Sequence, residues 1–90
     1  MFWSVICADI ETFEFKNGMK FDAIITDPPY EKAYLPLWET LGRRALDWLK
    51  DDGLLVAIAP HLHLPTVIEL LSKNLQYQWL CGVFQPGSSA

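Results

Sequence analysis

Apolar residues in the first third of the chain fall into two short runs separated by a charged stretch. Residues 4–8 form the first run, which ends at Asp9, and residues 21–26 form the second, which ends at a pair of prolines. Both runs contain β-branched residues, and this pattern predicts strands. The stretch 11–20 between them contains an Asn-Gly pair, which favours a tight turn. We therefore expect a short hairpin or a loop there.

A helical spacing of apolar residues begins at Tyr34. Apolar side chains then recur at intervals of three and four residues, which predicts an amphipathic helix. They are Tyr34, Leu37, Trp38, Leu41, Ala45, Trp48 and Leu49. The polar sequence Asp51-Asp52-Gly53 is expected to end this helix. The run 54–59 that follows has no polar alternation, which is typical of a strand covered on both faces in a parallel sheet.

A second helix and a last strand complete the predicted fold. Pro65 suits the first turn of a helix, and an apolar stripe that includes Val67 leads to a C-terminal cap at Asn74. Residues 77–84 make the last strand. The predicted order is β-β-α-β-α-β, an α/β fold with a mostly parallel sheet on which right-handed crossovers place the helices.

Length and composition fit a single domain. The chain has 90 residues, of which 51% are hydrophobic and 20% charged, whereas a second domain would need roughly 50 residues of its own. We expect the domain to span residues 1–86 and a flexible tail to occupy 87–90. The longest apolar run, 54–59, is far short of the roughly 20 residues that cross a bilayer, so no membrane contact is predicted.

Charge and cysteine usage bear on environment and partners. The net charge is −4 and no basic stripe is visible, so we expect weak DNA binding by the chain alone. No export signal is apparent. Cys7 and Cys81 each lie in an apolar stretch, which predicts buried, reduced thiols in a cytoplasmic protein.

The tetrapeptide Asp27-Pro28-Pro29-Tyr30 directly follows a predicted strand, at the edge where open α/β sheets bind ligands. Two prolines remove two N–H donors and stiffen the loop, so its carbonyl groups face no competing donor. Asp27 adds a carboxylate acceptor and Tyr30 a flat ring. An aromatic amine would fit, because its two protons could go to Asp27 and the Pro28 carbonyl. The competing interpretation is a rigid turn with Tyr30 at its rim.

This tetrapeptide in its context resembles the S-adenosylmethionine-dependent amino-methyltransferases, and most closely the DNA adenine-N6 methyltransferases. The strand 21–26, the sequence Lys50-Asp51-Asp52-Gly53 and the strand 54–59 are similar to segments of that family, although Asp51-Asp52 replaces its usual Pro-Gly. The resemblance implies a partial Rossmann-like methyltransferase sheet. It also implies that Asp27, Pro28, Pro29 and Tyr30 are catalytic, with a flipped adenine stacked on Tyr30 and its amine oriented by Asp27 and the Pro28 carbonyl.

The resemblance extends to cofactor and partners. Ala8-Asp9-Ile10 is similar to the acidic segment that borders the adenine of S-adenosylmethionine in the family, so Asp9 and Ile10 are expected to bind the cofactor. The family's glycine-rich turn has no counterpart, since no Gly-x-Gly pair occurs. The chain therefore resembles one half of a methyltransferase, which would meet DNA in a complete assembly.

Two alternative functions stay open. One is a catalytically silent methyltransferase-like module or assembly partner, which the missing glycine turn favours. The other is a protein glutamine N-methyltransferase, for which Asn rather than Asp at position 27 would be expected. In each case the strand 21–26 would have an unpaired edge, to be covered by residues 5–8 or by a second copy. An exposed edge invites pairing, so we expect a homo-oligomer, most simply a two-fold dimer.

Other polar and aromatic residues receive structural interpretations. His61 and His63 lack a nearby third ligand and are interpreted as loop histidines, so no metal is predicted. Trp38 and Trp48 lie on the apolar stripe and are assigned to the core rather than to base stacking. The pair Arg43-Arg44 is interpreted as a solvated helix face.

Overall fold

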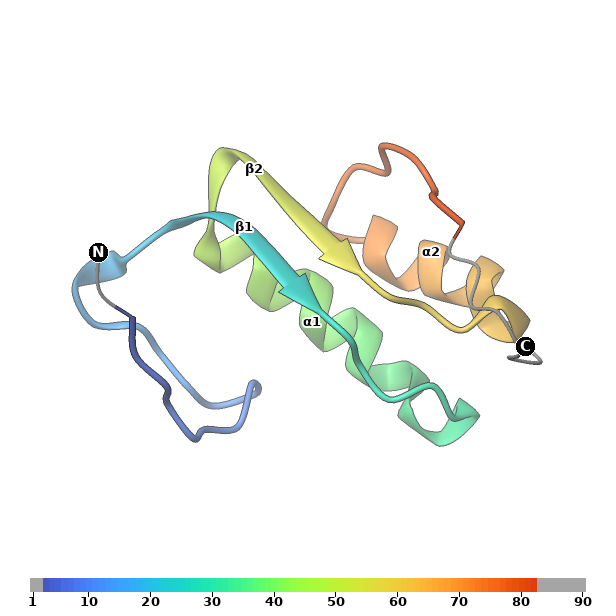
Figure 1. The fold of residues 1–90 in the computed structure, drawn as a ribbon, viewed down its shortest axis with the longest axis horizontal. Helices are drawn as coiled ribbons and strands as arrows, with labels where there is room; N and C mark the ends of the chain where they lie inside the picture. The colour runs from blue at the N-terminus through green and yellow to red at the C-terminus, as the bar shows by residue number, and fades with distance from the viewer. Residues whose placement is uncertain (1–2, 83–90) are drawn as a thin grey trace.

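A computed structural model describes residues 3–82, which form a small α/β fold (Figure 1). The strands and helices are β1 (Phe21–Thr26), α1 (Leu35–Trp48), β2 (Leu49–Ala57) and α2 (Leu64–Ser72). Single 3₁₀ turns occur at Lys16–Gly18, Lys32–Tyr34 and His61–His63. Gly18 has a φ of 62°, a left-handed conformation that glycine adopts without steric cost. The expected hairpin or loop between the first two apolar runs is thus a loop with one 3₁₀ turn.

The two strands pair in parallel, as the sequence predicts for this sheet. Their register runs from Ala23 opposite Leu54 to Thr26 opposite Ala57, and the Ile58 N–H donates to the Thr26 carbonyl over 3.0 Å. α1 supplies the long crossover that a parallel pair requires. The α/β class and the parallel pairing are confirmed. Within residues 3–82, however, the sheet has two strands, and the complete β-β-α-β-α-β order is not formed.

The start of β2 departs from the predicted turn. α1 ends at Trp48, and residues 51–53 belong to the strand rather than to a turn that ends the helix. Phe21 pairs with Leu49, and Ala23 pairs with Leu54. A single residue of β1 therefore lies opposite four residues of β2, and β2 bulges between Leu49 and Leu54. A Cβ on Gly53 would lie 3.0 Å from Leu49 Cδ2 and 3.1 Å from the Asp22 carbonyl oxygen. A side chain at this position would force its neighbours to shift by a few tenths of an ångström, so glycine suits this close approach.

Both helices cover one face of the sheet. Trp38 and Leu41 of α1 and Val67 of α2 form a buried core cluster, and Trp38 is only 1% exposed. Apolar side chains pack against this core cluster from β2, the helices and the N-terminal segment. They are Ile10, Leu35, Leu55, Ala57, Ala59, Leu70 and Leu71. Figure 1 shows α1 running back beneath the strands with α2 beside it. The core assignment of Trp38 is confirmed, whereas Trp48 is half-buried.

The opposite face of the sheet is open in the part of the chain that the structure describes. We call it the outer face, and its side chains alternate with those that face the helices. They are Ala23, Ile25, Leu54, Val56 and Ile58. Ile25 is 79% exposed, and the three large residues from β2 and its extension are about half exposed. The prediction that 54–59 is covered on both faces is therefore wrong, because both helices lie on the same side.

Two predicted strands are not formed. Residues 4–8 have no regular secondary structure, and 77–82 likewise do not join the sheet; residues 83–84 and the predicted tail 87–90 lie outside the described residues. A strand needs a paired neighbour for its N–H and C=O groups. Neither segment pairs with β1 or β2, and the chain leaves α2 through a turn in which Asn74 and Leu75 donate to the Leu71 carbonyl.

The same two segments carry the cysteines. Cys7 and Cys81 are free and exposed, so the prediction of buried thiols is wrong. Their apolar neighbours had suggested buried strands, and without those strands the thiols reach solvent. Across residues 3–82, no helix combines the length and the apolarity needed to cross a bilayer.

Candidate functional site

The tetrapeptide forms an irregular turn at the carboxyl end of β1. It follows Thr26 directly and leads through the 3₁₀ turn Lys32–Tyr34 into α1. Because the Ile58 N–H donates to Thr26, this turn lies next to the carboxyl end of β2 as well. Tyr30 is 43% exposed, so its ring lies at the surface and not in the core. Within residues 3–82, no protein group donates a hydrogen bond to the Pro28 or Pro29 carbonyl.

The structure brings two of the predicted site residues together. The Tyr30 hydroxyl donates a hydrogen bond to Asp27 Oδ1 across the proline pair. This hydrogen bond raises the pKa of the Tyr30 hydroxyl above its ordinary value, with smaller contributions from desolvation and from the negative charge of Asp27. The phenol is therefore held in its protonated, donating form.

The α1 helix fixes where this turn sits. Pro36 occupies the first turn of α1, where its missing N–H costs no helical hydrogen bond. Trp38 and Leu41, in the first two turns of α1, anchor the helix in the core cluster. The tetrapeptide therefore joins β1, which is paired with β2, to a helix that is anchored in the core cluster, and its prolines restrict its backbone.

Asp9 and Ile10 form a separate feature of the N-terminal segment. Asp9 Oδ1 accepts the Glu11 N–H at 2.9 Å, and the Asp9 carbonyl accepts the Phe13 N–H at 2.9 Å. The Asp9 side chain thus caps its own turn, as aspartate does in Asx turns. Ile10 packs against the core cluster. Among residues 3–82, neither makes a hydrogen bond to the tetrapeptide.

Arg44 is a buried residue that the sequence analysis placed wrongly. It is 4% exposed, whereas Arg43 is exposed as predicted. Its Nε donates to the Ile10 carbonyl and its Nη1 to Glu14 Oε1, each over 2.9 Å. Its guanidinium also lies 4.7 Å from the centre of the Trp48 ring. Arg44 therefore ties the N-terminal segment to α1.

A signal for this burial was present in the helical spacing. Arg44 follows Leu41 by three residues and precedes Trp48 by four, so it lies on the apolar stripe of α1. A charge on such a stripe is buried only when it is paired. The partners Ile10 and Glu14 are distant in sequence, and for this reason the pattern alone did not reveal them.

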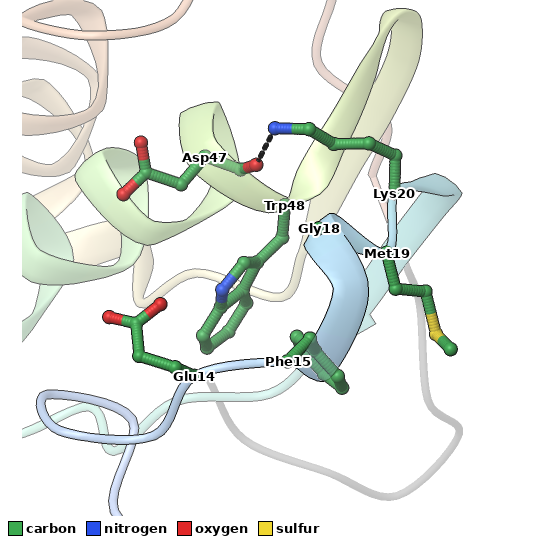
Figure 2. A pocket seen from close by; sticks show the side chains of 7 residues that line it. All are labelled: Glu14, Phe15, Gly18, Met19, Lys20, Asp47 and Trp48. Atoms are coloured by element: carbon green, nitrogen blue, oxygen red, sulfur yellow. Dashed lines mark hydrogen bonds between the residues drawn. The ribbon is translucent and has the colours of Figure 1, made fainter.

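Two hollows in the described surface lie at the other end of the sheet. One of about 270 Å³ is lined by Glu14, Phe15, Gly18, Met19, Lys20, Asp47 and Trp48 (Figure 2). A neighbouring one of about 320 Å³ is lined by Ile6, Phe13, Glu14, Phe15, Lys16 and Met19. Figure 2 shows Lys20 reaching the Asp47 carbonyl, which it binds at the end of α1. Neither hollow includes a residue of the tetrapeptide, which lies at the opposite end of β1.

The remaining candidate residues add no further site. His61 and His63 lie in the single turn before α2, and residues 3–82 contain no group of three or more side chains placed to hold a metal ion. Trp3 and Trp79 are exposed, on segments without regular structure.

Comparison with known proteins adds no family to this description. No protein-family model matches the chain, and neither the curated proteins nor the solved structures contain a significant match. Function is therefore inferred from the tetrapeptide, its surroundings and the resemblance in sequence.

Proposed function

We propose that this chain carries the adenine-binding and catalytic segment of an S-adenosylmethionine-dependent DNA adenine-N6 methyltransferase. The observation that carries the proposal is the position of Asp27–Tyr30, an exposed turn at the carboxyl end of a parallel strand. Open α/β sheets bind their ligands at this edge. A flipped base can reach such a turn, whereas a tetrapeptide buried in the core would be closed to it.

The chemistry of the turn suits an exocyclic amine. Asp27 offers a carboxylate and Pro28 a carbonyl, so each can accept one of the two amine protons. Pro29 adds stiffness, and the Tyr30 ring offers a face on which the base can stack. Acceptors at both protons draw electron density onto the nitrogen and align its lone pair, which are the contributions that a protein can make to this reaction.

S-adenosylmethionine would supply the methyl group as an electrophile. Asp9 Oδ1 accepts the Glu11 N–H, and neither of the two hollows described above includes a residue of the tetrapeptide. We therefore assign to this chain the binding of the amine and leave the methyl-donor site to residues outside the described range or to another chain.

The proposal includes a second copy and a cytoplasmic location. β1 pairs on one side only within the described sheet, and the outer face beside it is apolar. Both features favour a homodimer across the β1 edge. With a net charge of −4, the chain would need basic surface from elsewhere to hold DNA. Two free thiols fit a reducing compartment.

A catalytically silent assembly module is the second candidate. It is favoured by the location of the hollows, neither of which touches the tetrapeptide. Transfer to a protein glutamine is the third, since an amide also carries two N–H protons, and Asp at position 27 makes it the weaker choice.

Methyl transfer tests the proposal directly. Purified chain is incubated with tritiated S-adenosylmethionine and adenine-containing duplex DNA, and incorporation is compared for the wild type, Asp27→Ala and Glu31→Ala. Glu31 is an exposed carboxylate beside the turn and serves as the matched control. We expect Asp27→Ala to abolish transfer and Glu31→Ala to retain it. Asp27→Ala should keep the fold, because Asp27 lies at the surface.

Binding of 2′-deoxyadenosine, followed by NMR, covers the case in which the methyl-donor site lies on another chain. We expect weaker binding in Asp27→Ala than in Glu31→Ala. Tyr30→Ala should bind more weakly than Tyr30→Phe by about 1–3 kcal/mol, the scale of one aromatic stack. Equal binding by the wild type and both Asp27→Ala and Tyr30→Ala would refute the proposal.

A further inference from the structure

The side chains of Asp27 and Tyr30 form a hydrogen bond with each other in the free protein. The residues are three apart, and the Tyr30 hydroxyl donates to Asp27 Oδ1 across two prolines that restrict the backbone between them. Both groups are exposed, so water competes with the contact at all times. The contact therefore depends on the side-chain rotamers of Asp27 and Tyr30 and not on burial.

The ligand of this turn needs the groups that the contact uses. An exocyclic amine donates to the Asp27 carboxylate, which is what the Tyr30 hydroxyl already does. A stacked base needs a face of the Tyr30 ring, while the contact fixes that ring by its hydroxyl. The raised pKa of Tyr30 agrees with this geometry, because a hydrogen bond donated to Asp27 stabilises the protonated hydroxyl.

We propose that the Tyr30 hydroxyl is an internal competitor that occupies the amine position at Asp27, and that an adenine base binds by displacing it. This inference rests on the proposed function. It gives Tyr30 two roles: its hydroxyl closes the site, and its ring holds the base once the site is open. The turn is thus a two-state element whose closed state excludes the ligand.

The size of the effect follows from the strength of one hydrogen bond. A hydrogen bond of the usual net strength between Tyr30 and Asp27 favours the closed state over the open state about two- to tenfold. The apparent affinity for a ligand falls in proportion to the fraction of molecules that are open. Removing the hydroxyl while keeping the ring should therefore tighten binding about three- to tenfold.

The first experiment tests the closed contact without any ligand. Tyrosinate absorbance at 295 nm is followed against pH for the wild type, Asp27→Ala and Tyr30→Phe, with near-ultraviolet circular dichroism to follow the fold. We expect one tyrosine to ionise at higher pH in the wild type than in Asp27→Ala, and Tyr30→Phe to lack that step. Identical titrations of the wild type and Asp27→Ala would overturn the proposal.

The second experiment tests displacement. Dissociation constants for 2′-deoxyadenosine and for N6,N6-dimethyl-2′-deoxyadenosine, which has no amine proton, are measured with the wild type, Tyr30→Phe and Tyr34→Phe. Tyr34 is a neighbouring tyrosine of similar exposure and serves as the control. We expect Tyr30→Phe to bind 2′-deoxyadenosine about three- to tenfold more tightly than the wild type does, and the dimethyl compound to bind more weakly than 2′-deoxyadenosine, because it has no proton to donate to Asp27.

The outcomes separate this inference from the function on which it rests. Binding of 2′-deoxyadenosine that is equal or weaker in Tyr30→Phe would overturn displacement and leave adenine binding intact. It would mean that the hydroxyl supports Asp27 in the complex. Absence of binding by every variant would overturn both, whatever the titration shows.

Discussion

Arg44 offers the sharpest test of how the N-terminal segment is held. Arg44→Met keeps an unbranched side chain of similar length and removes the guanidinium. The change deletes the hydrogen bond to the Ile10 carbonyl, the ion pair with Glu14 and the contact with the Trp48 ring. The matched control is Arg43→Met, which makes the same chemical change at the exposed neighbouring position.

The magnitude follows from these contacts. The charged hydrogen bond to Ile10 contributes about 1.5–3 kcal/mol. The Glu14 side chain is 75% exposed, so this ion pair adds only about 0.2–1 kcal/mol, and the ring contact about 0.5–2 kcal/mol. Arg44 Nη2, however, is buried without a hydrogen-bond partner in the described residues. Its removal relieves a desolvation cost of about 1–3 kcal/mol. With the middle of each range, the net loss on Arg44→Met should be about 2 kcal/mol.

Two measurements check this expectation. Urea unfolding gives the free energy of unfolding for both variants, and hydrogen exchange reports the Phe13 amide, which donates to the Asp9 carbonyl. We expect Arg44→Met to speed exchange at Phe13 while Arg43→Met does not. If the two variants unfold within about 0.5 kcal/mol of each other and Phe13 stays protected in both, Arg44 does not hold the segment.

Three further predictions concern the core, the outer face and the tetrapeptide. Trp38→Ala should lower the free energy of unfolding by about 3–5 kcal/mol in urea, whereas Trp79→Ala should change it by less than about 0.5 kcal/mol; equal effects would contradict the packing. Ile25→Thr should leave the free energy of unfolding within about 0.5 kcal/mol and reduce binding of an anilinonaphthalene dye, and a large destabilisation would show that the outer face is covered. The pKa of Tyr30 is raised above its unfolded value of about 10, so the contact with Asp27 contributes stability below that pH and loses it as pH rises through the folded pKa. The difference in free energy of unfolding between the wild type and Tyr30→Phe should therefore shrink as pH is raised from 8 to 11, and a difference independent of pH would contradict the contact.

The elements that the sequence predicted well are those specified by nearby residues. β1 has the bounds expected from its apolar run, and α1 begins within one residue of the expected position. The exposed turn at Asp27–Tyr30 was predictable because two prolines end a strand on their own. In each case the determining residues lie within a few positions of the element.

The elements that it predicted poorly depend on distant partners. Residues 4–8 have the composition of a strand, but a strand forms only where a neighbouring edge accepts it. Arg44 is buried because Ile10 and Glu14 meet it from the far end of the described chain. The hydrogen bond between Tyr30 and Asp27 depends on side-chain rotamers, which composition does not specify.

The two apolar faces of β2 have a consequence for how the strand finds its alignment. Polarity alone cannot specify it, because a slip by one residue exchanges one set of apolar side chains for another. Side-chain volume can specify the alignment, because the small residues Ala57 and Ala59 pack against the core cluster, whereas the larger Val56 and Ile58 point outward. A slipped strand would force the larger pair against Trp38 and its neighbours, and overpacking of this kind typically costs about 1–3 kcal/mol. The space beside Ala57 and Ala59 is therefore too small for the misaligned strand, and a core that accepted larger residues there would lose the main difference between the two alignments.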